Sequence, residues 1–490
     1  MASETKFKKT EIGLIPEHWE LLKVDDIKSK EKKAIISGPF GSNIGKRFFV
    51  ESGVPVIRGN NLTTDMRRFI DEGFVFVTPE KAEELNTWAL VNDIIFTAAG
   101  TLGQVGIIEK NSKFEKYIIS NKQLRLRVNE KKIYPLYSFY WFASPVVTKL
   151  IVNHNTGSTV PLINLSVLKN LPIAVPPLKI QDFIVNILSS LDDKIELNRK
   201  INQTLEAMAQ AIFKSWFVDF EPVKAKMAAI EAGEDAKGVN RAAMSAISGK
   251  TDEELDHLQA EQPEHYTQLK NTAELFPTAM QDSELGDIPE GWEVIPFSKL
   301  AKLDTTSVKP HEEPSRLWEH YSIPAFDVYE APVLELGSEI KSNKYKVNPT
   351  SILSSKLNPN TPRTWWPDVE YETSAICSTE FMQFIPTDES QRAFIFGLIT
   401  SDPFQSGIKQ RVTGSTGSRQ RAQPSAVAEM DVVKPKEELV LAYCLHLTAL
   451  FVLKAKNIKE NITLAKFRDT LLPKLLSGEL SVDAAKLAEE

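Results

Sequence analysis

Two stretches of the chain, one after Pro177 and one after Pro435, are nearly free of Gly and Pro and repeat apolar residues every seven positions. In the first stretch the a positions of the heptads are Ile184, Leu191, Asn198, Leu205 and Ile212, which are apolar except for Asn198. The second has the equivalent residues 259 positions later: Tyr443, Leu450, Asn457, Leu464 and Leu471. Ile180, Ile187, Ile201 and Met208 stand at d in the first stretch. This spacing predicts two long helices that pair as a coiled coil.

Both predicted helices place an asparagine at the same central a position, Asn198 and Asn457. A lone Asn in an apolar seam fixes register because its amide needs a polar partner. In an antiparallel pair of equivalent helices, only residues near the midpoint face their own counterparts. We therefore expect Asn198 and Asn457 to lie near each other at the middle of an antiparallel pair.

The segments that precede the helices have a different pattern, with short β-branched runs separated by Gly, Pro and Asn. In the first half these runs are 54–57, 74–77, 93–96 and 105–108. Runs of this length bounded by turn residues predict strands. Each half therefore reads as an α+β domain followed by a long helix.

An internal duplication sets this organisation. Residues 10–20 and 283–293 are identical at seven of eleven positions, and Thr156-Gly-Ser-Thr159 recurs as Thr413-Gly-Ser-Thr416. Repeats of this period define the architecture. We expect five segments: an α+β domain over 1–177, a helix over 178–221, an acidic linker or insertion over 222–282 with a helix around 251–260, a second α+β domain over 283–435, and a helix with a tail over 436–490.

The length of 490 residues suits two to four domains. The net charge of −7 hides an uneven distribution, because residues 1–177 carry 24 Lys and Arg against 18 Asp and Glu. Residues 222–282 carry 6 against 11, and residues 283–435 carry 15 against 21. The two cysteines suit a reducing compartment, and no run approaches the roughly 18 uncharged apolar residues of a membrane span. We therefore expect a cytoplasmic protein without membrane contact.

Side chains that pair with base edges stand on predicted loops of the first half. Arg pairs bidentately with guanine, and Asn or Gln with adenine. The candidates are Arg58, Asn60, Asn61, Asn121, Gln123 and Arg125, each of which also suits ordinary turn chemistry. In the second half, Lys409 and Arg411 on one side and Arg419 and Arg421 on the other flank the Gly-Ser-Thr segment and offset the local negative charge. Trp365 and Trp366 are expected in the core rather than on DNA.

Enzyme motifs find little support. Residues 41–46 fall one residue short of a phosphate-binding loop, with Arg47 in place of its Ser or Thr, and residues 100–106 open no predicted helix. We expect no metal, no cofactor and no catalytic residues. Three hypotheses remain: a non-catalytic DNA-reading scaffold, a stand-alone DNA enzyme with an unrecognised active site, and a coiled-coil adaptor without a DNA role.

Together these motifs resemble the DNA-specificity subunit of type I restriction-modification enzymes. The paired 10–20 and 283–293 segments, residues 191–198 running into 212–220, and residues 471–480 carry the resemblance, together with 37–42 and 356–363. The resemblance implies two target-recognition domains that read a split double-stranded DNA target. They are separated by two long antiparallel coiled-coil helices, which bind two methyltransferase subunits and recruit motor-nuclease subunits. It adds these DNA-binding candidates: Ser37, Gly38, Phe40, Ser158, Thr159, Lys356, Arg363, Ser415 and Thr416.

Overall fold

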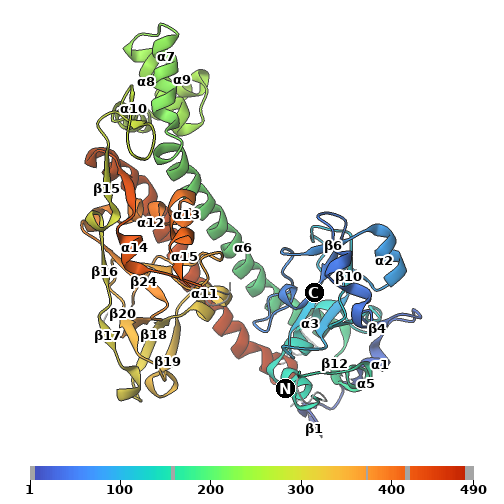
Figure 1. Ribbon diagram of the computed structural model, residues 1–490. Coiled ribbons are helices and arrows are strands. Elements are labelled where there is room, and N and C mark those ends of the chain that lie inside the picture. The colour runs from blue at the N-terminus through green and yellow to red at the C-terminus, as the bar shows by residue number, and fades with distance from the viewer. Residues whose placement is uncertain (1–5, 156–159, 371–373, 414–419, 481–490) are drawn as a thin grey trace, which may run out of the picture. The chain divides into compact units, whose positions relative to one another are not determined.

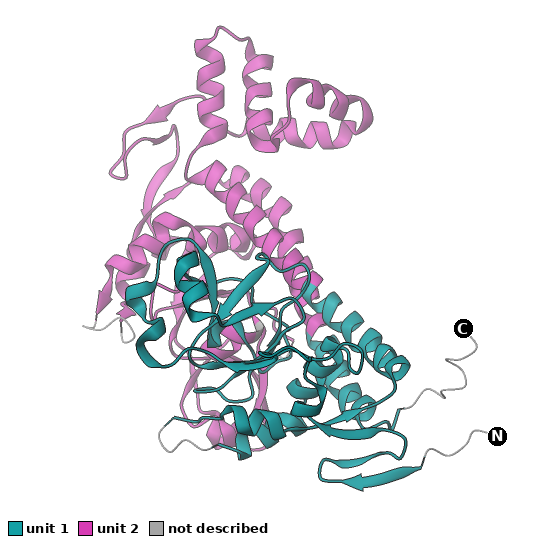
Figure 2. Cartoon of the chain, turned by 90° about the vertical axis from the view of Figure 1, so that its right-hand side faces the viewer, with its two compact units in different colours: residues 1–196, 462–490 teal, residues 197–461 magenta. Residues whose placement is uncertain are grey.

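The computed structural model describes residues 6–155, 160–370, 374–413 and 420–480 (Figure 1). The chain forms two compact units (Figure 2). Unit 1 contains residues 1–196 and 462–490, and unit 2 contains residues 197–461. Each unit therefore includes one α+β segment, part of the helix that follows it, and part of the other long helix.

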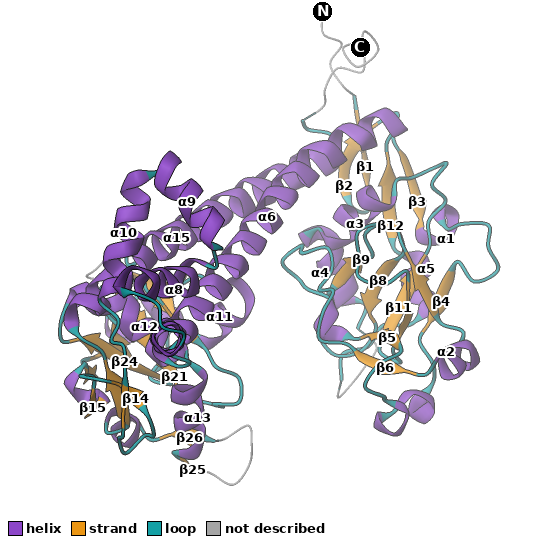
Figure 3. Cartoon of the chain, turned by 90° about the horizontal axis from the view of Figure 1, so that it is seen from above, coloured by secondary structure: helices purple, strands orange, loops and turns teal. Residues whose placement is uncertain are grey.

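Unit 1 is built on two four-stranded sheets and two strand pairs (Figure 3). The first sheet has the order β6-β5-β10-β7, formed by Val75–Val77, Val54–Ile57, Lys116–Ile119 and Trp88–Leu90. The second has the order β4-β11-β8-β9, formed by Ile35–Ser37, Gln123–Leu126, Ile94–Thr97 and Val105–Ile107. The pairs join β1 (Phe7–Thr10) to β2 (Gly13–Pro16) and β3 (Glu20–Lys23) to β12 (Pro172–Val175). The four predicted strands correspond to β5, β6, β8 and β9.

The short helices of unit 1 cover and connect these strands. They are α1 (Val24–Ile27), η1 (Gly41–Ile44), η2 (Lys46–Phe48), η3 (Gly59–Asn61), α2 (Pro79–Leu85), α3 (Pro135–Ala143), α4 (Pro145–Asn153) and α5 (Leu165–Asn170). Aromatic side chains of α3, including Tyr137, Phe139 and Phe142, are fully buried in a core that also contains Leu472 of the last helix. The last turn of that helix is therefore part of the core of unit 1.

Unit 2 repeats the strand order of unit 1 and adds β17 at the edge of its first sheet and the pair β25-β26. Its sheets have the orders β17-β20-β23-β18-β19 and β16-β24-β21-β22. The first is formed by Ser307–Val308, Lys344–Lys346, Ala375–Cys377, Leu317–Tyr321 and Val333–Leu336, and the second by Ala301–Asp304, Phe381–Pro386, Ile352–Ser355 and Thr364–Trp365. The strand pairs join β13 (Met280–Gln281) to β14 (Ile288–Pro289), β15 (Glu293–Pro296) to β27 (Asp431–Lys434), and β25 (Val412–Thr413) to β26 (Arg421–Ala422).

In both units one strand pair of the first sheet is parallel, β10 with β5 and β23 with β18. The remaining helices of the second α+β segment are η4 (Phe297–Lys299), η5 (Pro310–Glu312), α11 (Ile323–Tyr329), η6 (Gly337–Glu339), η7 (Glu389–Gln391), α12 (Arg392–Thr400), α13 (Asp402–Gln410) and α14 (Pro424–Ala428). The shared strand order confirms the repeated α+β fold that the duplicated motifs predict.

Residues 221–274 form four helices between the two α+β segments. These are α7 (Glu221–Glu231), α8 (Ala236–Ser248), α9 (Asp252–Glu261) and α10 (Pro263–Glu274). They enclose a small core around Met244, Leu255 and Tyr266. The predicted helix around 251–260 is α9, which begins with a capping box between Thr251 and Glu254.

The two predicted long helices are α6 (Leu178–Phe217) and α15 (Glu437–Leu476), each of 40 residues. In unit 2 they run antiparallel, because Asn198 bonds to Asn461 and Glu206, further along α6, bonds to Lys454, which is earlier on α15. In unit 1 the two helices are joined by Arg468 and Asp192, whose bond is 2.8 Å long.

Four asparagines form the centre of the helix pair in unit 2. Asn198 donates to Asn461 Oδ1 and Asn457 donates to Asn202 Oδ1, both at 2.9 Å. The two bonds are equivalent under the 259-residue repeat. The expected central position of Asn198 and Asn457 is thus confirmed, but each bonds to an asparagine one turn away from its own counterpart.

The buried faces of α6 and α15 differ from the predicted seam. The predicted a position Ile184 is buried, but the d residue Met208 is 47% exposed. The second buried series lies one position later, at e: Gln181, Leu188, Ile195, Asn202, Ala209 and Trp216. An a/d seam and an a/e seam have the same 3-4 spacing, so apolar periodicity does not distinguish them. Polar members of the series are satisfied by hydrogen bonds, as for Gln181, which bonds to the backbone of Tyr134, Lys132 and Pro176.

Among the described helices, α15 is long and apolar enough to cross a membrane by length and composition. Residues 439–453 of α15 contain no Lys, Arg, Asp or Glu, so this run comes closer to the length of a membrane span than we expected of any run from the sequence. Leu439, Tyr443, Leu447 and Phe451 of this stretch lie in the core of unit 2. Core packing therefore accounts for much of its apolar character.

Candidate nucleic-acid interface

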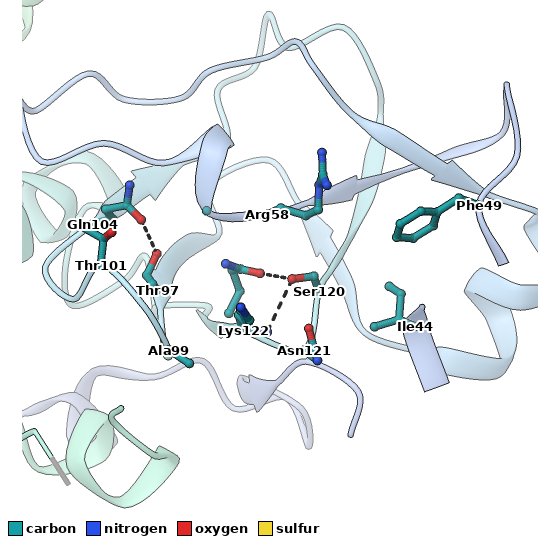
Figure 4. Close-up of a pocket in the computed structure, with 12 residues that line it drawn as sticks. Ile44, Phe49, Arg58, Thr97, Ala99, Thr101, Gln104, Ser120, Asn121 and Lys122 are labelled. Carbon is teal, nitrogen blue, oxygen red and sulfur yellow. Dashed lines mark hydrogen bonds between the residues drawn. The ribbon is translucent and has the colours of Figure 1, made fainter. Parts of the chain in front are cut away.

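Loops that connect the strands of unit 1 surround a cavity of about 400 Å³, which is lined mainly by polar residues (Figure 4). Ile44 and Phe49 lie at one end and Thr97, Thr101 and Gln104 at the other, with Arg58 and Ser120 between them. The complete lining is Ile44, Phe49, Arg58, Gly59, Thr97, Ala99, Thr101, Gln104, Ser120, Asn121, Lys122 and Gln123. Three sequence candidates, Arg58, Asn121 and Gln123, thus meet at one place.

The turn between β10 and β11 supplies one wall of this cavity. Asn121 and Lys122 are exposed at its tip, whereas Ser120 and Gln123 are buried at its base. The Ser120 hydroxyl bonds to the Gln123 side chain, and Gln123 Nε2 is buried without a hydrogen-bond partner. The turn therefore presents Asn121 and Lys122 on a base that packing and hydrogen bonds hold in place.

The 37–42 segment packs against this turn. The Gly38 amide donates to Gln123 O at 2.9 Å, and a Cβ on Gly38 would lie 1.8 Å from Ser120 O. Only glycine fits so close a backbone approach. Ser37 ends β4 and is half-buried, while the Phe40 ring is 87% exposed. The loop thus holds an exposed aromatic ring on a fixed backbone.

Residues 58–61 separate into exposed and internal side chains. Arg58 and Asn60 both donate to Gly73 O, at 3.4 and 3.2 Å, and Asn60 remains exposed. Asn61 is fully buried and bonds to the Arg58 amide and to the carbonyls of Ile70 and Glu72. Asn61 therefore shapes the loop and does not face a ligand.

Arg125 is also internal. Its guanidinium is buried against Asp93 and donates to the carbonyls of Trp88 and Lys33. Burial lowers the pKa of Arg125, and the adjacent Asp93 carboxylate opposes this shift. The structure thus gives Arg125 a core role, and we remove Arg125 and Asn61 from the interface.

In unit 2 the corresponding β23–β24 turn, residues 378–380, contains a carboxylate where unit 1 has Lys122. Arg421 forms a bidentate pair with Glu380, with the shortest contact at 2.9 Å, which raises the pKa of Arg421. Lys356 lies beside them, because its backbone bonds to Glu380 O and accepts from the Ala422 amide. Lys356 and Arg421 therefore both lie next to the β23–β24 turn.

Arg363 forms a second bidentate pair, with Asp327, at 2.6 and 2.9 Å. Among the residues that the structure describes, Arg58 and Lys122 form no ion pair, while Arg363 and Arg421 do. Two positive charges of the first segment, on Arg58 and Lys122, therefore line the cavity without a carboxylate partner among the described residues. The basic candidates of the second segment are partly neutralised by their own unit.

Five candidates, Ser158, Thr159, Ser415, Thr416 and Arg419, lie outside the described residues. Sequence reasoning missed Lys122, Thr97 and Gln104 of the cavity. Lys122 stood inside the 120–125 segment and its charge was a usable signal. Thr97 and Gln104 bond to each other at 2.9 Å across the β8–β9 hairpin, which no local motif indicated.

Trp365 and Trp366 were expected in the core. Trp365 is buried, and its ring lies edge-on to Tyr321 and Phe326. Trp366 is partly buried and stacks on Phe451 of α15, with ring centroids 4.5 Å apart. Both tryptophans pack inside unit 2, as expected.

Comparisons with known proteins place these features in a family. The model of the "Type I restriction modification DNA specificity domain" matches residues 16–207. The Haemophilus influenzae "Type I restriction enzyme HindI specificity subunit" is 30% identical over 395 residues, which cover 76% of this chain and 83% of that protein. The Methanocaldococcus jannaschii "Type I restriction enzyme MjaIX specificity subunit" is 24% identical over 98% of both chains.

A solved structure, the type I restriction-modification S subunit from M. genitalium, overlaps 94% of this chain and 96% of its own, with a TM-score of 0.47 and 14% identity. The relative from H. influenzae matches this chain over 76% of its length at 30% identity. The chain therefore belongs to the family of type I restriction enzyme specificity subunits.

Proposed function

We propose that this chain is the non-catalytic subunit that selects the DNA target of a type I restriction-modification complex. The observation that carries the proposal is the duplicated α+β fold with a polar turn at the same place in each copy. These turns are residues 120–122 after β10 and 378–380 after β23. Two similar readers suit a target of two separated half-sites.

Each reader would use the loops around its turn. In unit 1 these are Arg58, Asn121 and Lys122 at the cavity, together with the exposed Asn60 and Phe40 on neighbouring loops. In unit 2 they are Lys356 and Arg421. Asn, Arg and Lys at such positions can read base edges, and the same side chains can contact phosphates. We propose residues 1–177 and 283–435 as the two target-recognition domains, with 222–282 as an insertion.

The helices α6 and α15 would serve as the ruler between the readers. A 40-residue helix is roughly 60 Å long at 1.5 Å per residue. Half-sites one DNA turn apart are separated by about 34–36 Å. A pair of such helices is therefore long enough to hold two readers over separate half-sites.

Catalysis would come from partners. The relatives are named as subunits of restriction enzymes. We propose two methyltransferase subunits and motor-nuclease subunits as partners of the helices, in the cytoplasm where the complex meets chromosomal DNA. This assignment makes target choice a property of this chain and methyl transfer a property of another.

Methylation mapping tests the proposal. The chain is expressed with its methyltransferase partner in a cell without other modification, and methylated adenines are mapped genome-wide. A split motif with a fixed gap, absent when either partner is expressed alone, is expected. Methylation or cleavage by the purified chain alone would favour a stand-alone enzyme, and no motif with either arrangement would favour an adaptor without a DNA role.

A further inference from the structure

The loop formed by residues 62–73 links the candidate reading residues of unit 1 to the long helices. Its carbonyls hold the 58–61 segment: Gly73 O accepts from Arg58 and Asn60, and Ile70 O accepts from Asn61 at 2.9 Å. The position of these side chains therefore follows the position of the loop.

The other side of the same loop bonds to both long helices. Arg468 of α15 donates to Asp65 O at 3.1 Å. Arg68 donates to Ser189 O of α6 at 3.3 Å and to Asp193 at 2.8 Å. Arg67 lies 3.6 Å from Glu196 of α6. One short loop thus has polar contacts with two helices far from it in sequence.

These contacts meet in a network of Arg68, Glu109, Tyr140, Asp192, Asp193 and Arg468, in which Tyr140, Asp192 and Arg468 are buried and Asp193 is exposed. Arg468 donates to Asp192 Oδ1 at 2.8 Å, and Tyr140 donates to Asp192 Oδ2 at 2.7 Å. Arg68 donates in turn to Tyr140 Oη at 3.2 Å and to Glu109 at 2.8 Å. The Arg468 and Asp192 side chains are 6% and 9% exposed. The network therefore continues from α15 through α6 and α3 to the loop.

Buried charges contribute little net stability, because desolvation offsets their attraction. Their main contribution is to orientation, because the forked guanidinium of an arginine holds its acceptors at fixed positions relative to one another. Burial lowers the pKa of Arg68, but Tyr140 and Glu109 more than offset this, so Arg68 stays cationic. Burial also lowers the pKa of Arg468, but the adjacent Asp192 carboxylate more than offsets this, so the pKa is raised.

In unit 2 the loop equivalent to 62–73 connects β18 to β19 and approaches α15 through Glu330, which lies 4.0 Å from Lys454. Glu330 is 54% exposed, and this contact is longer than the 2.8 Å bond between Arg468 and Asp192. The segment after β22 contacts α15 through Trp366, which stacks on Phe451 with an interplanar angle of 12°. The short, buried, directional contacts of this loop are therefore in unit 1.

We propose that Arg68 and Arg468 are positioning residues that fix the unit 1 reading loops along the helix pair and thereby set how strictly the gap between half-sites is measured. The inference rests on the proposed function. It concerns the gap and leaves the half-site bases unchanged, because neither arginine lies at the cavity.

The test maps methylation for the full complex with Arg468→Ala. Wild type is expected to methylate one gap length. The variant should retain both half-site sequences while its preference for that gap over gaps one base pair longer or shorter falls by about tenfold or more, since removing a charged hydrogen bond changes an interaction by that order. Arg468→Lys, which keeps the charge but loses the fork, should give an intermediate preference.

A second variant guards against a misfolded first one. Arg468→Met with Asp192→Asn removes both charges while roughly keeping volume, and it should also broaden the gap. Arg241→Ala is the matched control, because Arg241 pairs with Asp252 and Asp256 in the inserted helices. The complex with Arg241→Ala should methylate targets of one gap length, as wild type does.

A single wild-type gap in every Arg468 variant that methylates would overturn the inference. So would loss of methylation in all of them together with the double variant, because that outcome makes the network a folding element. If wild type itself showed no split motif, the proposed function would fail instead.

Discussion

Replacing Asn198 with alanine tests the central asparagine cluster. The Asn198 amide donates to Glu460 Oε2 and to Asn461 Oδ1, both at 2.9 Å, in the buried centre of the helix pair. One neutral bond contributes about 1 kcal/mol and one to a carboxylate about 1.5–3 kcal/mol. The substitution also removes Asn198 Oδ1, a buried acceptor without a partner, which returns about 1 kcal/mol or more. We expect a local loss of roughly 1–3 kcal/mol.

Hydrogen–deuterium exchange measures this loss where it occurs. Amides in peptides covering 192–208 and 451–467 should exchange roughly 5- to 150-fold faster in Asn198→Ala, as 1.4 kcal/mol corresponds to a factor of ten. Gln203→Ala is the control, because Gln203 is exposed on the same helix. In a double-mutant cycle with Asn461→Ala, the coupling should be about 0.5–3 kcal/mol. Exchange in Asn198→Ala no faster than in Gln203→Ala would refute the proposed register role.

Three further predictions concern the readers and the ruler. Glu380→Gln should strengthen DNA binding and steepen its salt dependence in fluorescence anisotropy, because it releases Arg421 from its carboxylate; unchanged salt dependence would remove Arg421 from the interface. Phe40→Ala should weaken target binding by about tenfold without lowering the melting temperature, because the ring is exposed; equal affinity would show that the ring does not touch DNA. Four residues inserted after Ala207 add roughly 6 Å of helix and should lengthen the gap by one base pair, or at most two, in methylation mapping, with the half-sites unchanged; an unchanged gap would contradict the ruler.

The sequence predicted the elements of the helix pair well and its contacts less well. The starts of α6 and α15 followed from Pro177 and Pro435, and the central asparagines followed from heptad position. The ends differ from the prediction, because α6 stops at Phe217 and α15 continues through Pro473 to Leu476. The choice between d and e did not, because Gln181 and Asn202 are buried polar residues that apolar periodicity disregards. Their partners, at Tyr134 and Asn457, are distant in sequence.

The candidate interface shows the same limit at the scale of single residues. Asn60 and Asn61 are neighbours of the same type, yet one is exposed and the other fully buried. Arg421 carried a positive charge in the sequence, but Glu380, 41 residues away, neutralises it. Residue type and loop position predicted that Arg58, Asn121 and Gln123 come together, at the cavity of unit 1. The partners of each side chain depend on tertiary packing that no local motif contains.

The central claim is that each α+β segment reads one half of a split target, and a paired change at the cavity tests it most directly. Asn121→Ala with Lys122→Ala removes two exposed side chains from the unit 1 turn and leaves unit 2 untouched. Methylation mapping of the complex with this variant should show relaxed or weakened recognition in one half-site, with the other half-site and the gap unchanged. Changes in both halves, or in neither, would contradict the claim.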